Sequence, residues 1–328
     1  MRSTSDRASR SPLAVDTRLG NYRIVRALGA TAIGMLYAAE HVVLPRRALV
    51  KVATRAGSVP LLREACLLEA LRHAGIPAVY ESGLLADARP WFAFEAASGE
   101  RVSDETNRGP LRPLEVAALI RDVARVLEHA HRRGVVHAGL RPERIVLTTG
   151  RGYPLCVTEW SDARTHDAAP AIPHVPAPGA RGYMAPEVVR GDAMDDRADI
   201  YALGVVAYQA LTGQLPAEAY VSVGERSPRA PRELATVIDQ MLARDRFDRP
   251  SSREVVADIG WVTDAARSTG DTLTEMAAVT DVELVDMDGM PEASPRIRQP
   301  RWTPYVVASV DPAGVVVGEI DDVSRSRR

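Results

Sequence analysis

The chain has 328 residues, of which 46% are hydrophobic and 26% are charged, and its formal net charge is −2. This composition is typical of a soluble globular protein, and a nearly neutral chain has no global attraction for nucleic acid or an anionic membrane. The longest apolar-rich run, residues 200–211, is far shorter than the roughly 18–20 residues that cross a bilayer. We therefore expect no nucleic-acid partner and no membrane span.

The amino-terminal segment and the two cysteines bear on the cellular compartment. Residues 1–20 are rich in Ser and Arg and lack the apolar core of a signal peptide, which predicts a disordered segment. Cys66 and Cys156 lie in amphipathic or apolar stretches without metal-ligand spacing, which predicts two buried, reduced thiols. These features favour a cytoplasmic protein.

Residues 21–96 predict a small α+β unit. Within residues 60–75, Leu61, Leu68 and Leu71 recur at helical spacing, which indicates one amphipathic helix. Short runs with strand character flank this helix on both sides, and they are residues 22–28, 34–41, 47–53, 77–83 and 91–96.

Residues 97–262 predict a mainly helical unit. An amphipathic helix is expected over residues 111–134, with Gly134 as its C-cap. Short apolar runs follow within residues 135–160, and a Pro- and Ala-rich stretch, residues 162–182, predicts an irregular loop. The remaining helices are expected at residues 199–213, 232–245 and 251–262.

Beyond residue 262 the signal of a packed core fades. Residues 263–300 are interpreted as an acidic flexible linker, because residues 271–292 carry seven acidic and no basic residues. Such a segment is typical of a solvated tail or of a strip that docks a partner. Residues 301–328 predict a β-hairpin followed by a basic tail.

Nine stretches in residues 21–262, taken in order, resemble the landmarks of protein kinases, particularly the bacterial serine/threonine kinases. They are ALGATAIGMLYAAEH, ALVKV, LLREACLLEALRHAGIP, WFAFEAAS, VVHAGLRPERIVL, VTEWSDAR, GARGYMAPE, DDRADIYALGVV and RFDRPSS. The resemblance implies an α+β, two-lobed protein kinase-like fold. Its small β-rich lobe would be residues 21–96, and its larger helical lobe residues 97–262.

The resemblance also implies a nucleotide site in the small lobe. Gly29 and Gly34 match the first and third glycines of the phosphate loop, and Thr31 replaces the second. Lys51 matches the lysine that contacts the α- and β-phosphates of ATP, and Glu64 matches its ion-pair partner.

Lys51 is the only lysine among 41 basic residues, which favours a role that arginine does not fill. Two interpretations stay open: the pair with Glu64 contacts a nucleotide, or it only joins a strand to a helix. Phe94 matches the gatekeeper, and Glu95 and Ala97 would offer backbone groups to an adenine.

Three positions that perform the chemistry in the family are changed. Gly139 replaces the aspartate that serves as base, and Arg144 replaces the asparagine that holds magnesium. Glu159 replaces the metal-binding aspartate and is one methylene longer, so it remains a candidate Mg²⁺ ligand. Loss of a general base alone costs about 10²–10⁴ in rate. Asp162 is expected to be a solvated loop residue, with a shifted metal ligand as the alternative.

Positions that support the fold in the family are retained. His137 and Asp199 match residues that brace the catalytic loop. Glu187 and Arg249 match a buried ion pair, in which removal of one partner would leave a costly unpaired charge.

Two function classes follow from this pattern. The first is a pseudokinase, a kinase-like signalling or scaffold protein. It would bind ATP without effective Mg²⁺ chemistry, and a protein partner would read its kinase-like surface or residues 271–292. The alternative is a weak or atypical serine/threonine kinase that transfers the γ-phosphate of ATP to protein, using Glu159 and Arg141.

Overall fold

The computed structural model describes residues 12–54, 56–149, 151–165, 179–217 and 219–268. The predicted acidic strip and carboxy-terminal hairpin therefore lie outside the described residues. Within those ranges, no helix is both long enough and apolar enough to cross a membrane.

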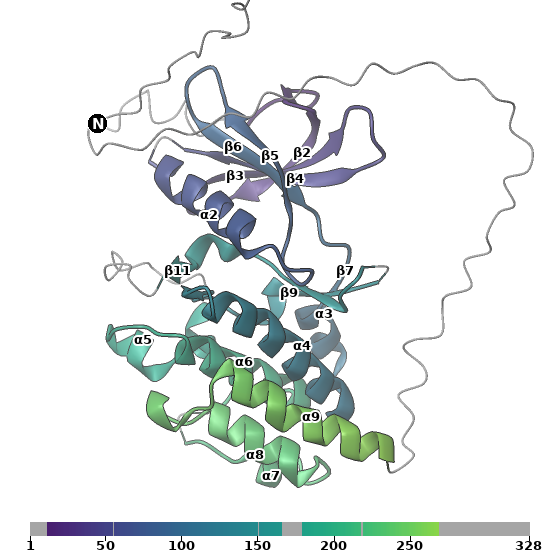
Figure 1. Cartoon of the computed structure of the whole chain (residues 1–328), viewed down its shortest axis with the longest axis vertical. Helices are drawn as coiled ribbons and strands as arrows, with labels where there is room; N and C mark the ends of the chain where they lie inside the picture. The colour runs from purple at the N-terminus through teal and green to yellow at the C-terminus, as the bar shows by residue number, and fades with distance from the viewer. Residues whose placement is uncertain (1–11, 55, 150, 166–178, 218, 269–328) are drawn as a thin grey trace, which may run out of the picture. The chain divides into compact units, whose positions relative to one another are not determined.

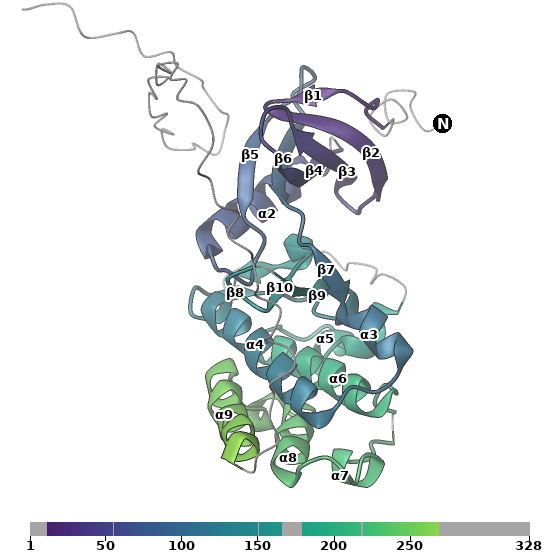
Figure 2. The ribbon, with the colours of Figure 1, turned by 90° about the vertical axis from the view of Figure 1, so that its right-hand side faces the viewer.

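The amino-terminal unit is a twisted antiparallel sheet with one helix against it (Figures 1 and 2). The strand order is β1-β2-β3-β4-β6-β5, and the helix α2, Ser58–Leu71, connects β4 to β5. The strands are β1 Arg18–Leu19, β2 Tyr22–Ala30, β3 Gly34–His41, β4 Arg47–Ala53, β5 Val79–Leu84 and β6 Pro90–Glu95. The predicted helix and the five predicted strands are thus confirmed, with small shifts at their ends.

The period of two in β4 directs its side chains to two different cores. Ala48, Val50 and Val52 are buried in a cluster on the face of the sheet away from α2. Lys51 lies between Val50 and Val52 and therefore points to the opposite face, where α2 packs. Burial of the strand's alternate residues thus fixes the direction of the chain's only lysine.

The prediction of disorder over residues 1–20 is wrong for residues 12–20. Leu19 is buried beside the outer core of the sheet, and Leu13 packs against the same cluster. The main chain is also held, since the amide of Asp16 donates to Ile24 O and the amide of Ile24 donates to Thr17 O, both at 2.9 Å. Apolar side chains this widely spaced give no periodic signal, yet they cover an edge of the sheet.

The carboxy-terminal unit is mainly helical, and α6 runs through its centre (Figure 1). Its helices are α3 Val102–Arg108, α4 Pro113–His131, α5 Pro186–Arg190, α6 Arg197–Thr212, α7 Val223–Arg226, α8 Arg232–Met241 and α9 Ser252–Ser268. Its short strands are β7 Gly99–Arg101, β8 Val135–Val136, β9 Ile145–Thr148, β10 Leu155–Val157 and β11 Arg164–Thr165. Its 3₁₀ turns are η1 Pro142–Arg144, η2 Trp160–Asp162, η3 Ala180–Tyr183 and η4 Arg246–Asp248.

Several predicted boundaries are corrected. α4 ends at His131 rather than at Gly134, because the last residues leave the helix in a tight turn whose final residue, Gly134, has φ +69°. α9 continues to Ser268, six residues into the predicted linker. The predicted irregular loop contains β11 and η3 at its two ends.

The two cysteines also differ from each other. Cys156 is buried in β10, and burial raises the pKa of its thiol to about 11. Cys66 is exposed, because it lies on the outer side of α2, opposite the buried residues Leu61 and Leu68. The expectation of two buried thiols is therefore wrong for Cys66.

Candidate functional site

Lys51 and Glu64 form a buried ion pair between β4 and α2. Lys51 Nζ lies 2.5 Å from Glu64 Oε1, and the two side chains are only 6% and 2% exposed. The ring centroid of Phe94 lies 5.6 Å from the same ammonium, a distance that allows a cation–π contact. Burial outweighs the attraction of Lys51 and raises the pKa of Glu64. The strand and helix are therefore held in the arrangement that the family resemblance implied.

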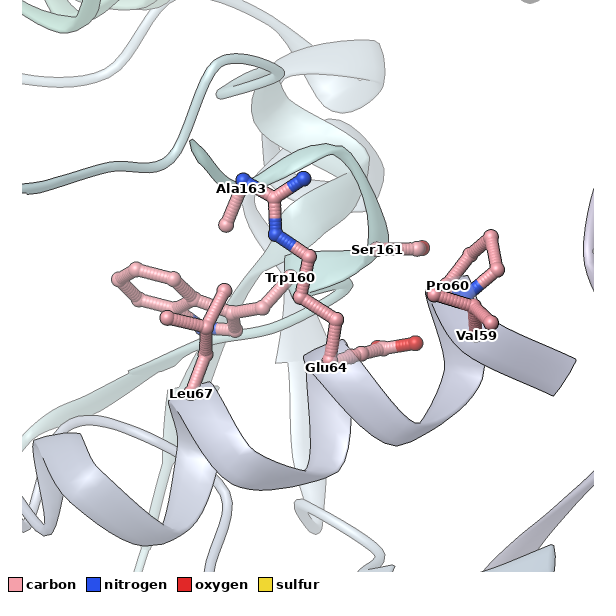
Figure 3. Close-up of a pocket in the computed structure, with 8 residues that line it drawn as sticks. Val59, Pro60, Glu64, Leu67, Trp160, Ser161 and Ala163 are labelled. Carbon is pink, nitrogen blue, oxygen red and sulfur yellow. The ribbon is translucent and has the colours of Figure 1, made fainter. Parts of the chain in front are cut away.

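A small cavity lies between α2 and η2. Its volume is about 120 Å³, and Glu64 and Leu67 of α2 line it together with Trp160 and Ser161 of η2 (Figure 3). Glu64 Oε2 is buried and has no hydrogen-bond partner within the described ranges. The ion pair thus leaves one carboxylate oxygen beside this cavity.

The turn between β2 and β3 is closed by its own residues. The amide of Thr31 donates to Gly34 O at 2.7 Å, and the hydroxyl of Thr31 accepts the amide of Gly34 at 3.0 Å. A Cβ on Gly34 would lie 2.1 Å from Val52 O, so this glycine is required by packing on β4. Gly29 has φ +148°, a backbone conformation that strains any other residue. These glycines therefore shape the turn whether or not a phosphate binds.

The segment between β6 and β7, which we call the hinge, connects the two units and is held by Arg151. No sequence pattern predicted this role for Arg151. Arg151 donates to Glu95 Oε2 at 2.7 Å and to Ile76 O at 3.0 Å. Ala97 lies two residues beyond Glu95, between β6 and β7. An isolated arginine between two short strands carries no sequence signal for this contact.

Asp199 of α6 orders the loop that follows β8. Its carboxylate accepts the amides of His137 and Ala138 at 2.8 and 2.9 Å, and it contacts His131 Nε2 at 2.9 Å. Burial alone would raise the pKa of Asp199, but the hydrogen bond and charge of His131 outweigh burial and lower it. Ala138 is held at φ +61°, an unusual conformation for a residue with a side chain.

Gly139 leaves a space that the guanidinium of Arg144 occupies. A Cβ built on Gly139 would lie 2.1 Å from Arg144 Nη1 and 2.9 Å from Asp162 Oδ2. Arg144 is only 8% exposed. A side chain at position 139 and this placement of Arg144 therefore exclude each other.

Arg144 is held between two carboxylates. Its Nη1 donates to Asp162 Oδ2 at 2.7 Å, and its Nε lies 3.0 Å from Glu159 Oε2. Arg141 Nη2 approaches the same Glu159 oxygen at 3.9 Å. The expectation that Asp162 is a solvated loop residue is wrong, since its side chain is 27% exposed and pairs with Arg144.

Glu159 reaches this cluster through a left-handed backbone. Its φ and ψ are +58° and +61°, which turn the chain sharply between β10 and η2. A residue with a side chain costs about 1–2 kcal/mol in this conformation. The preceding residue offsets the cost, because the amide and hydroxyl of Thr158 donate to Arg144 O at 2.7 and 3.0 Å. The segments that carry Glu159 and Arg144 are thus joined by their main chains.

These residues do not fit a magnesium ion. Magnesium requires near-octahedral oxygen ligands, and a guanidinium is a cation without an acceptor atom. Both carboxylates, Glu159 and Asp162, face Arg144 instead. Across the ranges that the structure describes, no group of three or more His, Cys, Asp or Glu side chains is placed to hold a metal.

Glu187 and Arg249 form the second buried ion pair of the fold. Arg249 donates from Nη1 and Nη2 to the two Glu187 oxygens at 2.6 and 2.8 Å. Burial would raise the pKa of Glu187, but the hydrogen bonds from Arg249 outweigh it and lower the pKa. This pair joins the start of α5 to the turn before α9.

Comparisons with known proteins match this chain to one protein family. The family described as "Protein kinase domain" matches residues 22–259. Serine/threonine-protein kinase Pkn1 of Myxococcus xanthus is 35% identical over 216 residues, which cover 62% of this chain and 30% of that protein. Serine/threonine-protein kinase PrkC of Bacillus subtilis is 28% identical over 271 residues, covering 76% and 41%. The chain thus spans less than half the length of these curated relatives.

A solved structure supports the same fold. The autoinhibited serine kinase domain of the giant muscle protein titin matches with a TM-score of 0.62 at 22% identity, covering 73% of this chain and 79% of that one. The β-rich unit with α2 and the helical unit around α6 are therefore the two lobes of a protein kinase fold. By the family match over residues 22–259, this chain belongs to the protein kinase domain family, and bacterial serine/threonine kinases are among its relatives.

Proposed function

We propose that this protein is a pseudokinase, a kinase-like signalling or scaffold protein whose site holds a nucleoside triphosphate without transferring its phosphate. The observation that carries the proposal is the contact between Gly139 and Arg144. Phosphoryl transfer by protein kinases needs an aspartate that accepts the substrate hydroxyl proton. Here the position has no side chain, and a cation occupies the adjoining space.

Nucleotide binding is supported by the parts of the site that hold phosphates. Lys51 is the sole lysine of the chain, and it is buried and paired with Glu64 in the manner expected for contact with phosphate. Phe94 and the hinge residues Glu95 and Ala97 adjoin the same region, where an adenine would bind. A protein partner would then bind selectively to the conformation that the nucleotide stabilises.

The partner is proposed to contact the kinase-like surface or residues 271–292. The acidic character of that segment would favour a basic surface on the partner.

A weak kinase activity is the second candidate, and the formed Lys51–Glu64 pair favours it. Glu159, whose side chain is 49% exposed, and Arg141 would then support transfer to a protein hydroxyl.

One experiment separates the two candidates. The full chain is incubated with [γ-³²P]ATP and generic protein substrates, and ATP binding is measured in parallel by thermal shift. A pseudokinase gives a shift that Lys51→Met abolishes, and it gives no labelled protein. Labelling that disappears in Glu159→Ala would overturn the pseudokinase proposal. A wild-type protein that shows no shift with or without Mg²⁺ would overturn nucleotide binding.

A further inference from the structure

We infer that the guanidinium of Arg144 is a built-in cation that takes the place of the metal in this site, so that a nucleoside triphosphate binds without a divalent cation. This inference rests on the nucleotide binding proposed above and specifies how the phosphates are neutralised.

The first support is the position of Arg144 between the two carboxylates that remain for a metal. Asp162 lies 2.7 Å from one guanidinium nitrogen and Glu159 lies 3.0 Å from another. A metal ion would have to displace a buried side chain, because the side chain of Arg144 is only 10% exposed. Glu159 and Asp162 are therefore already paired with a cation, the guanidinium of Arg144.

The second support is the charge of the cluster. Arg141 and Arg144 place two positive charges beside Glu159 and Asp162, and Glu143 Oε2 lies 3.7 Å from Arg141 Nε. A divalent cation entering this cluster would have to approach both guanidinium groups at close range, where screening by solvent is weak. The phosphates of a nucleotide would be attracted by the same two guanidinium groups and repelled by the carboxylates.

The third support is a pair of unused donors. Within the described ranges, the Nε atoms of Arg141 and Arg144 are buried and have no hydrogen-bond partner, although Arg141 Nε forms an ion pair with Glu143 Oε2 at 3.7 Å. Glu159 Oε2 is 3.0 Å from Arg144 Nε, but the N–H is not directed at it. Buried donors normally find an acceptor, and guanidinium groups match phosphate oxygens in geometry and charge. These donors point to an anionic ligand.

The fourth support is that the placement of Arg144 depends on the glycine at position 139. Arg144 can occupy its place only because Gly139 has no Cβ. The residue at the position of the family's base therefore makes room for the cation at the position of the family's metal ligand. This coupling explains why an arginine, which is larger than asparagine, is accommodated in a buried position.

The test is the affinity of the full chain for ATP, measured by titration calorimetry in EDTA and again in excess MgCl₂. The wild-type protein should give dissociation constants that agree within about threefold in the two conditions. Arg144→Lys, which keeps a cation, should still bind in EDTA. Arg144→Asn should lose at least about tenfold in EDTA and recover in MgCl₂, because Glu159 and Asp162 then no longer face a guanidinium and an asparagine oxygen is added to the site.

Arg190→Asn is the matched control, since Arg190 is an exposed arginine in α5 that pairs only with nearby Asp192 among the contacts described. It should bind ATP as the wild type does. Thermal unfolding of each variant reports whether it is folded, and the wild-type comparison does not depend on any variant.

Two results overturn the inference alone: wild-type binding that needs Mg²⁺, or Arg144→Asn binding in EDTA as tightly as wild type. Absence of wild-type binding in both conditions overturns the proposed nucleotide binding as well. The two failures are thus distinguishable.

Discussion

The guanidinium of Arg144 lies where a side chain at position 139 would begin, since a Cβ on Gly139 would be 2.1 Å from Arg144 Nη1. This contact links the two positions at which the family resemblance implies a base and a metal ligand. It means that a side chain can be introduced at position 139 only if the guanidinium of Arg144 moves.

Gly139→Ala is expected to destabilise the protein by about 1–3 kcal/mol, because the added methyl must displace a buried guanidinium from Asp162. Denaturant unfolding measures this change. In an Arg144→Asn background the same substitution should cost less, since the nearest obstructing group is gone and only Asp162 Oδ2, 2.9 Å from the added Cβ, still has to shift. A double-mutant cycle that shows no coupling between the two positions would contradict the contact.

Lys51→Met is expected to destabilise the protein by about 3–5 kcal/mol at neutral pH, because Glu64 is left buried without its counter-charge. Burial already raises the pKa of Glu64 above its unfolded value, and loss of Lys51 raises it further. A carboxyl of this kind costs stability as the pH rises above its unfolded pKa of about 4.5, so the deficit should be larger at neutral pH than in mild acid.

Unfolding of Lys51→Met at several pH values measures this dependence, and Lys51→Met/Glu64→Gln is its control. The double variant should recover much of the stability and lose the additional pH dependence, because no buried carboxylate remains. An equal deficit at every pH in the single variant would show that lost packing, rather than the unpaired charge, sets the cost.

His137 is expected to make the fold sensitive to mild acid. Burial lowers the pKa of His137, so the folded protein keeps it neutral, donating from Nε2 to Thr158 O at 3.1 Å. The unfolded chain binds a proton near pH 6.5, so the stability that this residue contributes is present above that pH and is lost as the pH falls below it. A single titrating group changes the free energy of unfolding by at most about 1.4 kcal/mol per pH unit.

Thermal unfolding of wild type and His137→Gln between neutral pH and pH 5 isolates this contribution. The glutamine retains a donor for Thr158 O but does not titrate, so its stability should fall less steeply with acid. Identical slopes in the two proteins would mean that His137 titrates alike in the folded and unfolded states.

Local sequence patterns were sufficient to predict most of the fold. They did not predict the ion pairs among Arg141, Arg144, Glu159 and Asp162. The alternation of Ala48, Val50 and Val52 with Lys51 specifies both the strand and the face that the lysine occupies. Motif spacing likewise placed Gly139, Arg144 and Glu159 in one site. These features depend on residues close in sequence or on a pattern shared with relatives.

The partners of Arg144 could not be inferred in the same way. Asp162 follows Arg144 by 18 residues, and the two meet only because Glu159 adopts a left-handed backbone and Thr158 bonds to Arg144 O. No periodicity predicts such a turn. The contact of Arg151 with Glu95 similarly depends on where the β9–β10 connection meets the hinge.

Lys51→Arg separates the two interpretations of the sole lysine. Arginine pairs readily with carboxylate, so the variant should keep the link to Glu64 and lose no more than about 1–3 kcal/mol to the tighter packing of a larger side chain. A compact ammonium at this buried position suits contact with phosphate, so ATP affinity should fall by at least about tenfold. Calorimetry and denaturant unfolding of the same preparation measure both quantities. If stability and affinity are both retained, an arginine can do what Lys51 does, and the position joins β4 to α2 without a specific role in nucleotide binding.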